Sequence, residues 1–213
     1  NALLVTEGNV FLERALALKE GLYVVKASPE DALAAAGYDL YIYDGTLPET
    51  MPETGAVLAV NPPSDVLAFQ PGEEKNAGVS LRAAARGEAA ELCQNLLLND
   101  VAIKTYRPLS GGTPVLLNGS DALLSISNEA GRRSAALAFD LHESNLPLQA
   151  DFPVLIQNLL AYLLPDTAAA VENAACGESV AFALDARCVS AFVQAPSGKQ
   201  LPLEGSALEN TDE

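Results

Sequence analysis

The sequence predicts an α/β fold, with a doubly wound, mostly parallel sheet followed by a small β-rich, sandwich-like segment. Three observations point to this fold class: short wholly apolar runs, helical patterns between them, and a change of pattern after residue 165. Wholly apolar runs are typical of strands that are covered on both faces of a parallel sheet. We expect an α/β domain over residues 1–165. A β-rich segment, either packed on that domain or truncated, is expected over residues 166–213.

The first 45 residues carry the clearest pattern. Residues 2–6, a short apolar run, and residues 22–26 and 39–43 are expected strands. Asn9 is placed to cap a helix between the first two strands. The apolar stripe of that helix is Phe11, Ala15 and Leu18. A serine followed by proline and two acidic residues predicts a second helix over residues 28–37. Helical connections this short imply right-handed crossovers, so the three strands should be parallel.

The same patterns predict the remaining elements. A fourth parallel strand is expected at residues 56–60, and strands at 79–84 and 101–107 are expected on either side of a helix at 88–96. Residues 111–114 should form a turn, residues 121–127 and 134–139 a hairpin, and residues 152–164 a buried helix. The C-terminal segment contains three short alternating runs, at 180–184, 189–194 and 200–203. Three such strands bury little surface by themselves.

The charge of the chain excludes two classes of partner. Formal net charge is −16 at pH 7, and 49% of the residues are hydrophobic. A surface this negative repels phosphate backbones, so no nucleic-acid partner is expected. Anionic membrane surfaces are disfavoured for the same reason. The expected partner is another protein or the other domains of the parent protein.

The cysteines do not form a metal-binding pattern. Cys93, Cys176 and Cys188 have no CxxC spacing, and the chain contains one histidine. A structural zinc site needs four nitrogen or sulfur ligands, so no metal is expected. Cys176 and Cys188 either pair across adjacent strands or remain two free buried thiols. No glycine-rich nucleotide motif follows the first strand, so no cofactor is expected.

Polar residues follow several of the expected strands. In a doubly wound sheet the ligand crevice lies beyond the carboxyl ends of the strands, which all meet at one edge. The candidate ligand-binding residues at this edge are Glu7, Asn9, Asp44, Asn61, His142 and Glu143. The alternative is that these residues only make turns, because loops at strand ends are commonly built from Asp, Asn and Gly.

The order of these segments resembles class I glutamine amidotransferase-like domains. The resemblance is carried by residues 38–45, the strand at 56–60 and the late segment that contains His142, Glu143 and Ser144. It implies a flavodoxin-like sheet with a cysteine on a Gly-x-Cys-x-Gly elbow and a late His-x-Glu. Here the elbow region reads Asn61-Pro62-Pro63-Ser64, and Cys93 lies too far downstream to replace the missing cysteine. Since Glu143 follows His142 directly, the late motif is also broken.

A narrower resemblance rests on residues 3–13, 38–45 and 139–148. These strings are similar to a bacterial group of membrane-anchored proteins, in which a von Willebrand factor A-type domain related to aerotolerance regulators precedes an amidotransferase-like domain. This resemblance implies a location on the extracytoplasmic face of a membrane. The chain begins with Asn1, directly before a strand-like run, so we expect it to be part of a larger protein.

Without a nucleophile, His142 has nothing to activate. Amide hydrolysis of the amidotransferase type begins with attack by a thiolate. The expected function is therefore a non-catalytic interaction or ligand-sensing domain, and no catalytic residue is assigned. The alternative is a hydrolase or transferase with a rearranged site around His142, Glu143 and Ser144. Ser64 is a weaker replacement nucleophile, because prolines stand where the elbow glycines should allow close approach.

Overall fold

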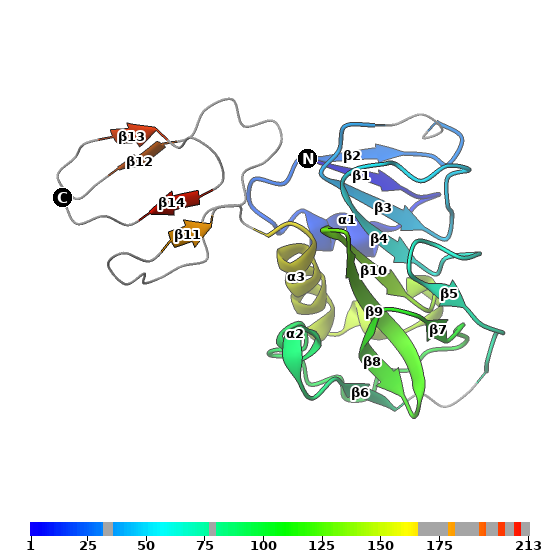
Figure 1. Cartoon of the computed structure of the whole chain (residues 1–213). Coiled ribbons are helices and arrows are strands. Elements are labelled where there is room, and N and C mark those ends of the chain that lie inside the picture. The colour runs from blue at the N-terminus through cyan, green and yellow to red at the C-terminus, as the bar shows by residue number, and fades with distance from the viewer. Residues whose placement is uncertain are drawn as a thin grey trace. The chain divides into compact units, whose positions relative to one another are not determined.

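The computed structural model describes residues 1–31, 36–76 and 80–165, together with the backbone of four short strands beyond them. The chain divides into two compact units, Asn1–Leu164 and Pro165–Glu213 (Figure 1). In the second unit β11 (Ser179–Ala181) pairs antiparallel with β14 (Ala207–Glu209), and β12 (Phe192–Gln194) pairs antiparallel with β13 (Gln200–Pro202). The positions of Cys176 and Cys188 lie outside the described residues.

The first unit contains a ten-stranded mixed sheet. Its strands are β1 (Ala2–Val5), β2 (Val24–Ala27), β3 (Leu40–Asp44), β4 (Ala56–Val60), β5 (Gln70–Pro71), β6 (Leu81–Ala83), β7 (Leu109–Ser110), β8 (Thr113–Asn118), β9 (Asp121–Glu129) and β10 (Arg132–Leu137). Its helices are α1 (Val10–Leu16), α2 (Gly87–Glu91) and α3 (Asp151–Leu163), with single 3₁₀ turns at η1 (Leu141–Glu143) and η2 (Leu146–Leu148).

One half of the sheet is parallel. Its strands follow the order β2-β1-β3-β4-β10, and each neighbouring pair in this order is parallel. The predicted parallel arrangement of the first four strands is thus confirmed, although β2 begins two residues later than expected. All residues of β1 and β4 are buried, as the wholly apolar runs indicated.

The other half of the sheet is built from antiparallel pairs. The predicted hairpin is present: β10 pairs with β9 from Arg132↔Glu129 to Leu137↔Leu124. Beyond β9 lie β8 and β7, which pair in turn with β6 and β5. The coarse prediction of an α/β fold is therefore correct. Seven of the ten strands share one direction, since β9, β5 and β6 run against the other seven.

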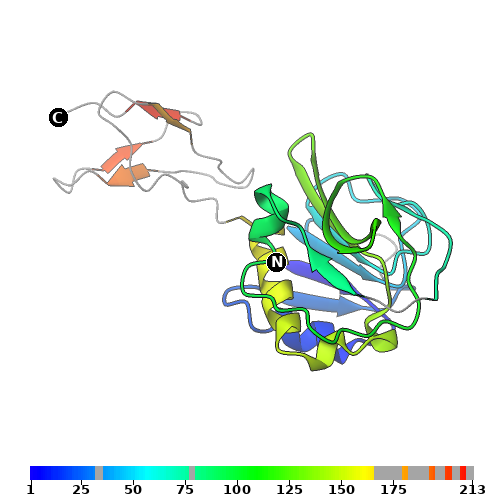
Figure 2. The ribbon, with the colours of Figure 1, turned by 90° about the horizontal axis from the view of Figure 1, so that it is seen from below.

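Different elements cover the two faces of the parallel half. Figures 1 and 2 show α1 and α3 on the same side of the sheet, and the side-chain amide of Gln157 in α3 donates to the carbonyl of Ala15 in α1 (2.8 Å). The opposite face presents Leu3, Val5, Tyr41, Tyr43 and Val57, which pack with side chains that include Leu47 and Met51 from the loop after β3. Residues 32–35 of the expected second helix lie outside the described part, and residues 29–31 before them form a turn in which Asp31 bonds to Ser28.

Four sequence-based expectations are wrong in detail. Helix α1 ends at Leu16 and buries Leu12, Ala15 and Leu16, so Leu18 is exposed and does not extend the stripe. Helix α2 ends early because the amide of Asn158 binds two carbonyls of the following turn. Residues 101–107 form no named strand, since their backbone N–H groups bond to turns such as Glu143 instead of a continuous ladder. Residues 113–114 begin β8 and are not only a turn.

Candidate functional site

The carboxyl ends of β1, β3, β4 and β10 meet at one edge of the sheet. Backbone bonds join them there: the N–H of Gly45 donates to Val60, and the N–H of Asn61 donates to Leu137, each at 2.8 Å. This edge holds the candidate residues that follow these strands. We call it the polar edge, and define it by Thr6, Glu7, Asn9, Asp44, Asn61, Asp140 and His142.

Asp44 is the centre of a hydrogen-bond network on the polar edge. Its Oδ2 accepts from the Thr6 hydroxyl at 2.7 Å and from the Asn9 amide at 3.1 Å. The other end of Asn9 caps α1, because its Oδ1 accepts from the N–H of Leu12 at 3.1 Å. Asn9 is fully buried, whereas Asp44 is partly exposed. One buried amide therefore fixes both the start of a helix and the orientation of a carboxylate.

Asn61 occupies the position expected for the elbow residue. It follows β4 directly and has a φ of 47°, in the left-handed region that few residues other than glycine adopt. Asparagine tolerates this conformation better than most side chains. The next residue, Pro62, is buried. The backbone thus makes a sharp turn after β4, with an amide side chain at the turn where the amidotransferase-like pattern has a thiol.

His142 lies in the 3₁₀ turn η1, after β10. Asp140 caps this turn: its Oδ1 accepts from the backbone N–H of His142 at 2.8 Å and lies 3.1 Å from the ring Nδ1. The ring also packs against Phe11 of α1, with centroids 5.8 Å apart and planes tilted by 56°. These two contacts fix the imidazole beside the start of α1 while nearly half of its side-chain surface remains exposed.

Glu143 and Ser144 point to other partners. The carboxylate of Glu143 pairs with Lys104 at 2.5 Å, and this hydrogen bond raises the pKa of the Lys104 ammonium. The Ser144 hydroxyl donates to the carbonyl of Leu141 at 3.2 Å. These residues line a shallow open hollow with His142 and residues 102–104. The three members of the rearranged site considered above therefore have three different partners.

The environment of Cys93 does not favour a reactive thiolate. It is buried near the end of α2, and its Sγ lies 3.6 Å from the carbonyl of Val115. Burial raises the pKa of the Cys93 thiol, which keeps it protonated at neutral pH. Within residues 1–31, 36–76 and 80–165, no cluster of three or more His, Cys, Asp or Glu side chains is arranged to hold a metal ion.

The structure brings some of the predicted site residues together and separates others. Asn9 and Asp44 are in direct contact, and His142 lies beside the helix that Asn9 caps. Glu7 is exposed on the same edge, whereas Glu143 pairs with Lys104. Two residues of the polar edge, Thr6 and Asp140, were not among the predicted site residues. Both are short polar side chains at the ends of buried strand runs, which is the signal that could have identified them.

No family model matches this sequence, and the search of curated proteins finds no match. The fold is similar to two solved structures. Cytoplasmic Protein STM3548 from Salmonella typhimurium aligns with a TM-score of 0.53 and 12% identity, covering 76% of this chain and 98% of its own. Cytoplasmic Protein STM1381 from Salmonella typhimurium LT2 aligns with a TM-score of 0.50 and 10% identity, over 76% of this chain and 98% of its own. At these identities the likeness concerns the fold alone.

The comparisons correct one expectation. The narrower resemblance implied a location on the extracytoplasmic face of a membrane, but both structurally similar proteins are named as cytoplasmic. In the part of the chain that the structure describes, no helix has the length and apolar character needed to cross a bilayer. The names of the two similar proteins contradict the expected extracytoplasmic, membrane-anchored location.

Proposed function

We propose that this chain is a non-catalytic binding domain whose ligand or protein partner contacts the polar edge. The proposal includes a flavodoxin-like, amidotransferase-like fold without its nucleophile. The strand order β2-β1-β3-β4-β10 supports this part, because flavodoxin-like sheets have the order 2-1-3-4-5. Ligands of such sheets bind beyond the carboxyl ends of the strands, where Asp44 and His142 lie.

The single observation that carries the proposal is the bonding of His142. Its Nδ1 is engaged by Asp140, and no hydroxyl or thiol of the described residues lies within hydrogen-bond distance of the ring. A histidine base must reach the proton that it removes from a nucleophile. Ser144 is the candidate nucleophile nearest to His142 in sequence, and its hydroxyl donates to the carbonyl of Leu141 instead.

The backbone after β4 supports the same conclusion. An acyl-transfer site needs backbone N–H groups aimed at the developing oxyanion. Pro62 and Pro63 follow Asn61 and have no N–H to donate. The carbonyl of Pro63 accepts from Arg107 at 3.1 Å. The segment therefore lacks both the nucleophile and two possible donors, and what remains is a fixed polar surface suited to recognition.

Hydrolysis assays test the absence of catalysis. The whole chain is incubated with L-glutamine or p-nitrophenyl acetate, and release of ammonia or nitrophenolate is compared between the natural sequence and His142→Ala. We expect equal background rates, because no nucleophile depends on His142. A rate that falls on His142→Ala, and falls equally on Ser144→Ala, would establish the hydrolase alternative.

Protein-observed NMR tests the binding surface. A set of small polar fragments is screened for shifts of backbone amide signals, and the bound fragments are mapped onto the fold. We expect the shifts to cluster on Gly8, Gly45 and Asn61, and to weaken in Glu7→Gln. The matched control is Glu20→Gln, an equal change of charge at an exposed site away from these strand ends. An absence of shifts at these three residues with every fragment would contradict the proposal.

A further inference from the structure

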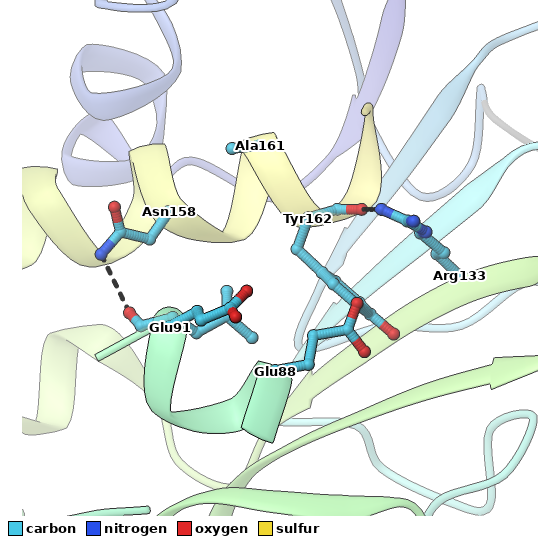
Figure 3. Close-up of a pocket in the computed structure, with 7 residues that line it drawn as sticks. Glu88, Glu91, Arg133, Asn158, Ala161 and Tyr162 are labelled. Atoms are coloured by element: carbon cyan, nitrogen blue, oxygen red, sulfur yellow. Dashed lines mark hydrogen bonds between the residues drawn. The ribbon is translucent and has the colours of Figure 1, made fainter. Parts of the chain in front are cut away.

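A second pocket lies at the opposite end of β10 from His142. Its volume is about 350 Å³, within the size range of small-molecule sites. It is lined by Glu88, Glu91, Leu92, Arg133, Asn158, Ala161 and Tyr162. Figure 3 shows Glu88 and Glu91 on α2, Asn158 and Tyr162 on α3, and Arg133 beside Tyr162. The proposed binding at the polar edge does not involve this pocket.

Arg133 is held in place on one wall of the pocket. Its Nη1 donates to the backbone carbonyl of Tyr162 at 2.6 Å, and its guanidinium carbon lies 5.2 Å from the centre of the Tyr162 ring. A guanidinium has five N–H donors in a planar fork, so donors remain for a ligand. No carboxylate of the described residues forms an ion pair with Arg133. The Arg133 guanidinium is thus held in one orientation, and its positive charge is not neutralised by a described carboxylate.

Two glutamates stand on the facing wall. Glu88 and Glu91 are three residues apart on α2, a spacing that places both on one face of the helix. Both are exposed, and neither pairs with a cation in the described part of the chain. Burial, followed by the nearby Glu88 carboxylate, raises the pKa of Tyr162 to about 12, while Arg133 opposes this shift. The charges of Glu88 and Arg133 therefore both act on the same phenol.

The wall that carries the glutamates is fixed against α3. The Asn158 amide donates to the carbonyls of Leu92 and Gln94, at 2.9 and 3.1 Å (Figure 3 shows the bond to the carbonyl of Leu92). The phenol of Tyr162 donates to the carbonyl of Ser127 at 2.9 Å. The side chains of Asn158 and Tyr162 are thus both bonded to backbone carbonyls. These bonds hold α2, which carries the glutamates, and the Tyr162 side of the pocket in fixed positions.

The charges of this pocket specify a type of ligand. Two carboxylates and one guanidinium leave a net charge of −1, which is complemented by a molecule with one carboxylate and two cationic groups. We propose that the pocket binds a basic α-amino acid, with its carboxylate on Arg133 and its two cationic groups on Glu88 and Glu91. A guanidinium recognises a carboxylate through two parallel hydrogen bonds. Leu92 and Ala161 provide apolar surface for the methylene chain.

The charge of the whole chain favours the same ligand. A net charge of −16 raises the local concentration of cations around the protein and disfavours acidic ligands. This long-range effect is not specific to one site. The test must therefore separate the pocket from the general field, which a variant with the same change of charge elsewhere can do.

Isothermal titration calorimetry of the whole chain with L-lysine tests the proposal. Three related probes each change one group: L-norleucine lacks the second ammonium, cadaverine lacks the carboxylate, and L-glutamate has the opposite charge. We expect lysine to bind and each of the other probes to bind at least about tenfold more weakly, since a hydrogen bond to a charged group contributes at this level.

Variants assign the binding to the pocket. The double variant Glu88→Gln and Glu91→Gln should weaken lysine binding about tenfold. Glu20→Gln combined with Glu30→Gln makes the same change of charge at other exposed positions and should leave the affinity unchanged. Arg133→Gln should weaken lysine binding but not cadaverine binding. The exposed glutamates can be replaced without disturbing the core, so this comparison remains available if Arg133→Gln does not fold.

Three results would overturn the proposal. One is the absence of heat of binding with lysine at millimolar concentration. Another is equal binding of norleucine and lysine. The third is an equal loss of affinity in the Glu20 and Glu30 double variant, which would assign the effect to the general field of the protein.

Discussion

Replacement of Asn9 by alanine should destabilise the protein more than its small change in volume suggests. Asn9 is fully buried and makes two bonds: it accepts from the N–H of Leu12 and donates to Asp44. Loss of a helix cap costs about 0.5–2 kcal/mol, and loss of a bond to a charged group costs about 1.5–3 kcal/mol. We expect Asn9→Ala to lower the free energy of unfolding by about 2–4 kcal/mol.

Urea denaturation followed by circular dichroism measures this loss, and two matched variants divide it. The serine of Asn9→Ser keeps an acceptor for the helix cap but does not reach Asp44. This variant should therefore lose about half as much free energy of unfolding as Asn9→Ala. Asn9→Asp keeps the cap and places a second carboxylate beside Asp44. This variant should lose stability, because the two like charges repel each other. A loss below about 1 kcal/mol for Asn9→Ala would refute the reasoning.

Three further predictions concern the core, the tyrosines and the two units. The Ser125 hydroxyl is buried and has no hydrogen-bond partner among the described residues, so Ser125→Ala should raise the free energy of unfolding by about 1 kcal/mol; a loss in the same urea assay would contradict this. Burial is the main reason why the pKa values of Tyr43 and Tyr162 are raised from 10.0 to about 12. These two tyrosines ionise at lower pH in the unfolded chain, so their contribution to the free energy of unfolding is complete below pH 10 and is lost as the pH rises toward 12. The loss of stability should follow the rise of tyrosinate absorbance, and titration of all six tyrosines near pH 10 would disprove it. A chain that ends at Pro165 should unfold cooperatively by heat, because residues 1–164 form a compact unit; a broad, non-cooperative transition would show that the tail completes the core.

The parallel half of the fold could be predicted because burial on both faces leaves a simple signal. Residues 56–60 form a strand with the expected bounds, since every side chain in this run is apolar and buried. The antiparallel half was less predictable. Strand β8 was missed because Pro114 follows two glycines and a threonine, a typical turn sequence. The structure accommodates Pro114 in the strand through a change of register between Pro114 and Leu116.

Residues 101–107 show why burial does not identify a strand. Val101, Ile103 and Tyr106 are buried, much as in a strand with one covered face. Their segment nevertheless makes single bridges, Ile103 with Ser144 and Tyr106 with Lys75. The difference lies in where the backbone N–H groups bond, which depends on residues about 30 to 40 positions away along the chain. Local sequence does not contain that information.

The candidate site was predictable to the extent that sheet geometry determines it. Asn9 and Asp44 could be placed together because parallel strands bring their carboxyl ends to one edge. The partners of His142 and Glu143 could not be predicted in the same way. The contact with Asp140 depends on the 3₁₀ turn, and the pair with Lys104 depends on the path of a segment that forms no strand.

Covalent labelling tests the central claim, a binding domain without a nucleophile, most directly. The whole chain is treated with a fluorophosphonate, which reacts with activated serines, and with a diazoketone analogue of glutamine, which reacts with amidotransferase nucleophiles. Intact-mass spectrometry then detects any adduct. We expect no adduct on Ser64 or Ser144 with either reagent. An adduct on one of these serines that disappears in His142→Ala would contradict it.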